Sequence, residues 1–141
     1  MPDSQKYLQI ERHDGQGYLP LVFSAGWQAA ILNWEPPIDL AQLGEIERHA
    51  RTDEVFVLLR GRAALFVRTD DQILVTDLQP GLVYNCTCGT WHNLLASRDV
   101  SILIVENRDT HLDDTEIRRM TDPERVQILA QLPAWAGQAG N

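Results

Sequence analysis

Short runs of β-forming residues, separated by turn signals, follow one another along most of this chain. Valine, isoleucine, leucine and aromatic residues fill the runs at 18–23, 27–34, 45–49, 54–60, 63–68, 72–78, 90–96 and 100–107. Turn-forming residues stand between them, at 60–62, 69–71 and 79–81. The connections are too short for the crossover helix that parallel strands need. We therefore expect an antiparallel sandwich or barrel.

One helix is predicted near the end of the chain. Thr121 and Glu124 form a capping box, with a proline in the first turn. Apolar residues then recur at helical spacing, at Val126, Leu129 and Leu132. We expect a helix over about 122–132 that packs outside a strand core of about 18–107. A length of 141 residues is typical of one domain, so we expect a single domain over 1–141.

The charge of the chain excludes two classes of partner. It carries 20 acidic against 12 basic residues, for a net charge of −8. Nucleic acids and anionic membranes both require a basic face, so we expect neither as a partner. No apolar run approaches the roughly 18 residues that cross a bilayer, and no signal-peptide pattern is present, so we expect a cytoplasmic protein. In that reducing compartment Cys86 and Cys88 are expected to be free thiols.

The stretch GEIERHARTDEVFVLL contains the first set of candidate ligands. Glu47 and His49 are two residues apart, so on a strand they project from one face, and Arg51 joins them if the strand continues that far. Glu54 begins the next strand-like run, on the same face as apolar residues. A buried carboxylate on such a face needs a partner, and a metal ion or a histidine would serve.

The stretch PGLVYNCTCGTWHNLL contributes one more candidate ligand. His92 lies in a strand-like run just after a permissive turn at Gly89, and Trp91 beside it projects to the opposite face. Two alternatives stay open here. His49 and His92 are each a hydrogen-bonded core histidine, or the two cysteines form a zinc site with His92, although their spacing is narrower than usual.

The remaining histidines and one charged segment are not assigned to the site. His13 and His111 lie in polar, loop-like stretches, where we expect them to be solvated. The segment ENRDT at 106–110 is predicted to be a turn network at a strand end rather than part of a catalytic site.

The two stretches resemble the two sequence motifs of the cupin superfamily. In the first motif, Glu54 and Gly61 match a glutamate and the glycine seven residues later. His49 matches the second histidine of a His-x-His pair, and Glu47 stands where the first would be. In the second motif, Gly81, Gly89 and His92 match the family pattern. The chain departs from that pattern at two positions, where Thr87 replaces a proline and Ala96 replaces a trailing asparagine.

The chain is also similar to a group of small single-domain bacterial cupins of unassigned activity, through GYLPLV, ILNW, ERHARTDEVFVLL and LIVENRDT. This closer resemblance implies a fold and no particular reaction. The implied fold is an all-β, cupin-type jelly roll, that is, a double-stranded β-helix barrel, with a short C-terminal helix.

The resemblance further implies a divalent metal, which cupins of the usual pattern hold with three histidines and a glutamate. Here the set is His49, Glu54 and His92, with Glu47 as the fourth ligand. Two imidazoles and two carboxylates suit Mn, Fe, Ni or Zn, and favour Mn and Fe over Cu. We expect metal affinity to fall below roughly pH 6, as the histidines protonate. Alternatively, Glu47 pairs with a neighbouring arginine and the barrel is metal-free.

Three residues are candidates for contacts with a substrate, and none is singled out as catalytic. Arg51 can grip a carboxylate or phosphate with two hydrogen bonds, and Tyr84 and Trp34 can line the mouth of a pocket. The hypothesis is a metal-dependent isomerase, lyase or dioxygenase acting on a small anion such as a sugar acid, keto acid or sugar phosphate. The alternatives are a non-catalytic binding or sensor module and a metal-free structural barrel. We expect a homodimer, since twofold dimers are the commonest oligomers.

Overall fold

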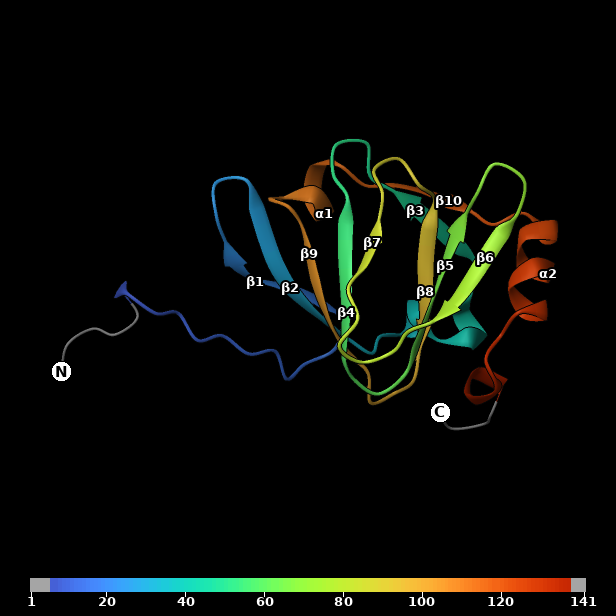
Figure 1. The fold of residues 1–141 in the computed structure, drawn as a ribbon, viewed down its shortest axis with the longest axis horizontal. Coiled ribbons are helices and arrows are strands. Elements are labelled where there is room, and N and C mark those ends of the chain that lie inside the picture. Colours follow the sequence, from blue (N-terminus) through green and yellow to red (C-terminus); the bar gives the residue numbers. More distant parts are fainter. Residues whose placement is uncertain (1–5, 138–141) are drawn as a thin grey trace.

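The computed structural model describes residues 6–137, which form two antiparallel five-stranded sheets that face each other (Figure 1). Strands of the first sheet lie in the order β1 (Tyr18–Phe23), β2 (Trp27–Asn33), β9 (Ser101–Asn107), β4 (Glu54–Arg60) and β7 (Tyr84–Cys86). Those of the second lie in the order β10 (Glu116–Arg119), β3 (Glu45–Arg48), β8 (His92–Ala96), β5 (Ala63–Arg68) and β6 (Ile73–Asp77). This mostly-β, jelly-roll arrangement is the predicted fold class.

Every predicted strand run contains a strand, and two further strands were not predicted. β7 and β10 are three and four residues long, and β10 has the polar sequence EIRR. Neither has enough apolar residues to show an alternating pattern, and each is held by pairing with a neighbouring strand. β7 pairs with β4 and β10 pairs with β3. The short elements are α1 (Thr110–Asp113) and three single turns of 3₁₀-helix at Pro36–Ile38, Leu40–Gln42 and Ala134–Gly137.

Alternation along the strands places one core between the sheets. On β4, Glu54, Phe56 and Leu58 are buried, and on β9, Ile102 and Ile104 are buried. Because these buried residues occupy alternate positions along their strands, an acidic side chain and apolar side chains point into the same interior. Burying a large aliphatic or aromatic side chain contributes roughly 1.5–3 kcal/mol. The apolar positions supply this stabilisation and hold the polar positions in place.

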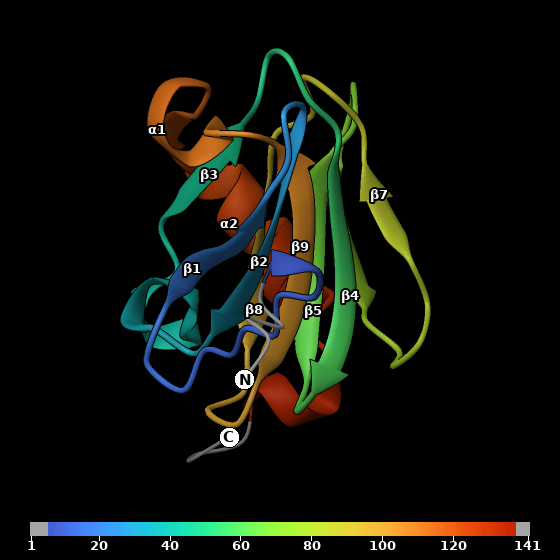
Figure 2. The same ribbon diagram turned by 90° about the vertical axis from the view of Figure 1, so that its left-hand side faces the viewer.

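In Figure 2, α2 (Asp122–Ala130) lies behind the two sheets. A second core lies between this helix and the outer face of the second sheet. Thr121 and Glu124 form the predicted capping box. The predicted apolar face of this helix is partly wrong, because Val126 and Leu129 are exposed, whereas Ile128 is fully buried and Leu132 packs beside it. The strand surface under the helix sets which face is covered, and helical spacing alone does not select it.

Among the residues that the structure describes, no helix has the length and apolar character needed to cross a membrane.

Candidate metal centre

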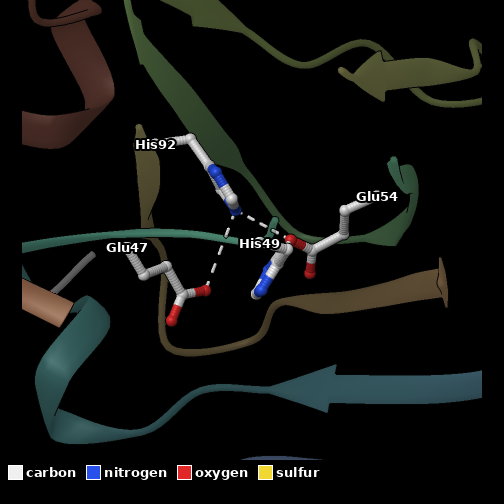
Figure 3. Close-up of side chains that lie close together, drawn as sticks. All are labelled: Glu47, His49, Glu54 and His92. Carbon is white, nitrogen blue, oxygen red and sulfur yellow. Dashed lines mark hydrogen bonds and ion pairs between the residues drawn. The ribbon is translucent and has the colours of Figure 1, made fainter. Parts of the chain in front are cut away.

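Four acidic and imidazole side chains from β3, β4 and β8 meet between the two sheets (Figure 3). Glu47 on β3 is the register partner of His92 on β8, and His49 follows the end of β3. Glu54 begins β4 on the opposite sheet. One potential ligand atom from each residue lies within 4.8 Å of the others. The convergence expected from the sequence is thus present, and Glu47 takes part in it.

Glu54 is at the centre of this cluster. Its Oε2 atom lies 2.9 Å from Nε2 of His49 and 2.7 Å from Nε2 of His92. Oε1 of Glu47 lies farther out, 3.8 Å from Nε2 of His92. Glu54 and both histidines are buried, whereas the Glu47 side chain is 32% exposed. One carboxylate oxygen therefore faces two imidazole nitrogens inside the barrel.

The outer nitrogens of both rings are already used in hydrogen bonds. Nδ1 of His49 donates to the carbonyl of Asp114 at 2.8 Å, and Nδ1 of His92 donates to the carbonyl of Thr90 at 2.9 Å. Since a carbonyl oxygen only accepts, each Nδ1 carries the proton, and a neutral ring then presents a lone pair at Nε2. Two lone pairs would face the Glu54 oxygen, so this contact needs either protonated rings or a cation.

The charge of Glu54 shifts the protonation of its neighbours. Burial alone lowers the pKa of His49, but the hydrogen bond and charge of Glu54 outweigh burial and raise that pKa to about 9. Burial likewise opposes the shift at His92, whose pKa is raised to about 11 by hydrogen bonds with Cys86 and Glu54. Burial also raises the pKa of Glu54, yet its two histidine partners prevail and lower it. Without a metal, the cluster is a carboxylate held between two imidazolium rings.

The donor set also fits a divalent transition metal. Two ligands bonded to one ion at about 2.1 Å and at right angles lie about 3.0 Å apart, close to the contacts around Glu54. Ligating histidines commonly donate their second ring nitrogen to a carbonyl, as His49 and His92 do here. Two imidazoles and two carboxylates are ligands that Mn, Fe, Ni and Zn accept.

A cavity of about 360 Å³ opens beside the cluster. Its apolar wall comes from both sheets and from the 3₁₀ turn at Pro36–Ile38, through Leu32, Pro37, Ile38, Ile46, Phe56, Leu94, Ile104 and Ile117. Its acidic residues are Glu35, Glu45, Glu47, Glu54 and Glu106, and no lysine or arginine is among the lining residues that the structure describes. The size suits a small molecule, and one side of the cluster faces this space.

The three residues predicted to contact a substrate lie outside this lining. β3 ends at Arg48, so the condition for Arg51 to project with His49 is not met. The Arg51 side chain is 62% exposed and donates to the backbone and side chain of Asp113. The hydroxyl of Tyr84 accepts from the backbone of Gln79, and Trp34 lies under the guanidinium of Arg98. Their ligand contacts stay predictions.

The structure adds polar residues that the sequence interpretation did not assign to the site. Glu106 is buried and lines the cavity, so the prediction of a turn network for ENRDT is wrong at this position. The sequence signal for its burial was its position two residues after Ile104 and four after Ile102, which places it on the same face of β9. His111 also lines the cavity, with Nδ1 3.0 Å from the amide nitrogen of Gln28, although it is exposed as predicted.

The alternative zinc site with cysteines is not formed. Cys86 is buried and Cys88 is exposed, and both are free thiols, as expected. Cys86 is the register partner of Glu54 on the neighbouring strand and forms a hydrogen bond with His92. Neither cysteine belongs to the four-residue group. His13 is also not simply solvated, since its Nε2 lies 2.9 Å from the carbonyl of Gly17.

The two facing sheets and the enclosed histidine–carboxylate cluster define a small β-barrel protein with a potential metal centre. No family model matches the chain. A comparison with curated proteins likewise gives no match.

Similar solved structures include Pac13 from Streptomyces, a nucleoside dehydratase solved with uridine, at 10% identity over 80% of this chain and 87% of that one, with a TM-score of 0.54. KdgF from Halomonas is 15% identical over 67% and 82%, with a TM-score of 0.51. A cupin-2 domain protein from Shewanella frigidimarina is 25% identical over 77% and 94%, with a TM-score of 0.46. KdgF and the cupin-2 domain protein belong to the cupin superfamily, and this chain has the cupin fold.

Proposed function

We propose that this chain binds one divalent transition metal through Glu47, His49, Glu54 and His92, and acts on a small polar molecule in the adjoining cavity. One observation carries the proposal: a single Glu54 oxygen lies 2.7–2.9 Å from two Nε2 atoms whose rings already donate through Nδ1. A cation at this point satisfies all three atoms together. Two histidines that only filled the core would not both need to point Nε2 at one carboxylate oxygen.

The residues of the chain would fix the metal and shape the space beside it. The carbonyls of Asp114 and Thr90 hold the two rings in orientation, and the apolar wall borders the space on one side of the cluster. A bound metal would supply Lewis-acid polarisation of a substrate oxygen. Isomerase, lyase and dioxygenase reactions remain the proposed classes, because the fold by itself does not select a reaction.

The expected charge of the substrate needs revision in this proposal. A small anion such as a sugar acid was expected because of Arg51, which lies outside the cavity lining. Among residues 6–137, the lining instead contains glutamates and no basic residue apart from histidine. We therefore propose a small polar molecule without requiring that it be an anion. Free cysteines are in keeping with the proposed cytoplasmic location.

Elemental analysis of protein purified without a chelator or a histidine tag tests the proposal. We expect one Mn, Fe, Ni or Zn per chain, and a rise in melting temperature when the metal-free protein is titrated with that metal. His92→Gln should abolish both, since it removes a buried ligand.

His13→Gln is the matched control, since the His13 ring hydrogen-bonds with the Gly17 carbonyl and does not belong to the four-residue group, and this variant should bind metal like the parent protein. If no metal shifts the melting temperature, or if His92→Gln binds as well as His13→Gln, the metal proposal fails. A small-ligand binding module without metal is then the better description.

A further inference from the structure

One buried carboxylate oxygen beside the cluster has no hydrogen-bond partner among residues 6–137. Glu106 is only 5% exposed, and its Oε2 atom accepts no hydrogen bond. Its other oxygen, Oε1, accepts a 2.5 Å hydrogen bond from the hydroxyl of Tyr18. The side-chain amide of Gln28 donates to that same hydroxyl at 2.9 Å and lies 3.4 Å from Oε1. Tyr18 and Gln28 therefore hold one half of the carboxylate and leave the other half open.

The open oxygen lies next to the metal-binding group without being part of it. Oε2 of Glu106 is 3.8 Å from Nε2 of His49, but Glu106 is not one of the four residues whose ligand atoms lie within 4.8 Å of one another. Glu106 also lines the cavity. Its Oε2 atom has less than 1 Å² of exposed surface, so a small shift of this side chain would bring it into contact with a molecule in the cavity, at the edge of the cluster. Buried polar atoms are nearly always hydrogen-bonded, so a missing partner at this place indicates a ligand group.

We propose that Glu106 positions the substrate by hydrogen-bonding one of its hydroxyl groups, and that the substrate is a neutral, hydroxyl-bearing molecule. This inference rests on the proposed function, which places the reacting molecule in this cavity. A hydroxyl both donates and accepts, so it satisfies Oε2 whether or not the carboxyl carries a proton. A carboxylate or phosphate offers only acceptors there.

The charge of the cavity supports the same class of molecule. Glu35, Glu45, Glu47, Glu54 and Glu106 line it, and the part of the lining that the structure describes has no lysine or arginine to offset an anion. Like charges in a cleft that excludes water repel more strongly than in bulk solvent. The apolar wall contributed by Phe56 and Ile104 suits the carbon face of a sugar or polyol. We therefore infer selectivity for neutral polyols and sugars over the corresponding acids.

Ligand-observed NMR titration of the metal-loaded protein tests this selectivity with matched pairs. The pairs are glycerol and glycerate, xylitol and xylonate, and glucose and glucuronate. We expect at least one neutral member to bind, and to bind at least about tenfold more tightly than its acid. Glu106→Gln, which keeps the shape of the side chain, should weaken that binding about tenfold or more.

Two further variants separate positioning from general charge. Tyr18→Phe removes the hydroxyl that holds Oε1 but leaves Oε2 in place, so we expect an intermediate loss of affinity. Glu11→Gln removes one exposed negative charge outside this cavity, and its affinity should match that of the parent protein. Glu106→Gln should stay folded, and its metal content should stay at the parent value.

Four outcomes overturn the inference. They are tighter binding of the acids, no binding of any neutral member, unchanged affinity in Glu106→Gln, and loss of metal in Glu106→Gln, which would make Glu106 a fifth metal ligand. The metal content of the parent protein is measured in a separate experiment. A parent protein that binds metal but prefers acids refutes this inference alone, whereas a parent protein without metal refutes the proposed function.

Discussion

At the scale of single residues, Glu54 organises the candidate centre because one of its oxygens serves two buried histidines. Removing a partner from a buried charged group leaves that charge uncompensated, which is among the costlier changes in a protein interior. The partly exposed Glu47 carboxylate is held less tightly, at 3.8 Å from His92. Glu54 therefore fixes the geometry of the cluster, and Glu47 completes its charge.

The pKa values of the cluster predict how the stability of metal-free protein depends on pH. Glu54 raises the pKa of His49 to about 9, above the ordinary value of 6.5. Between these values the folded protein binds more protons than the unfolded chain, so the free energy of unfolding should fall as pH rises from 6.5 to about 9. His92, with a pKa of about 11, extends this fall to higher pH.

Burial, together with the charge of Glu54, raises the pKa of Glu106 from 4.5 to about 7. Between these values the folded protein again binds more protons than the unfolded chain, so the free energy of unfolding falls as pH rises here too. Thermal melts of metal-free protein at pH 6, 7.5 and 9 check the trend, and Glu54→Gln should flatten it. A melting temperature that rises with pH in this range would contradict the prediction. Since protons compete with metal, affinity for metal should still be rising above pH 7, a higher window than ordinary histidines would give.

At the scale of elements, the turn between β4 and β5 depends on a glycine. Gly61 has a φ of +73°, and a Cβ atom there would lie 2.7 Å from Cα of Val100 and 2.8 Å from the Asp99 carboxylate. The turn therefore packs closely against the β8–β9 connection, which leaves no room for a side chain at position 61. This explains in physical terms why a glycine occupies the motif position.

Gly61→Ala should destabilise the protein by roughly 1–2 kcal/mol from the left-handed backbone and about 1–3 kcal/mol more from overlap. Gly81→Ala is the matched control, since Gly81 has a φ of +82° but open space around its Cβ position. It should show only the backbone cost of roughly 1–2 kcal/mol. Urea denaturation measures both, and equal losses would show that the overlap at Gly61 is relieved by local movement.

Helix α2 provides a second prediction at this scale. Ile128 is fully buried against the second sheet, and Val126 is 64% exposed. Ile128→Ala should therefore lower the free energy of unfolding by roughly 2–5 kcal/mol. Val126→Ala should change it by less than about 0.5 kcal/mol. The reverse order in urea denaturation would mean that the helix packs with the face first expected from its sequence.

At the scale of the whole molecule, the two sheets differ in what covers their outer faces. The second sheet has α2 against it, whereas the outward side chains at the centre of the first sheet are apolar and only partly covered. Register pairing makes this outer face continuous, through Ala29, Ile31, Val55, Val57, Leu103 and Val105. A broad apolar surface of this kind is a feature of protein interfaces. We propose that a second copy of the chain covers it.

Light scattering coupled to size-exclusion chromatography tests the homodimer. We expect the parent protein to elute with twice the mass of one chain. Val57→Lys should give a folded monomer, because it buries a charge in the proposed interface. Val126→Lys adds the same charge on α2, at the opposite end of the molecule from β1 in Figure 1, and should remain dimeric. A monomeric parent protein refutes the proposal.

Short-range alternation in the sequence predicts where the longer strands lie, because side-chain direction has a period of two along any strand. The resemblance to the two cupin motifs added the prediction that His49, Glu54 and His92 share an interior. Local chemistry also determined the capping box of α2. The pattern could not reveal β7 or β10, whose few residues become strands only by pairing with β4 and β3.

Which polar side chains face the cavity depends on contacts between distant parts of the chain. Arg51 turns outward because β3 ends at Arg48, and strand ends depend on pairing with other strands. Glu106 becomes a cavity residue because β9 lies between β2 and β4, which sets its inward face. Tyr18 and Gln28 reach Glu106 across 88 and 78 positions of sequence. Local sequence sets the side-chain period of each strand, but contacts across such separations are set by the closing of the two sheets.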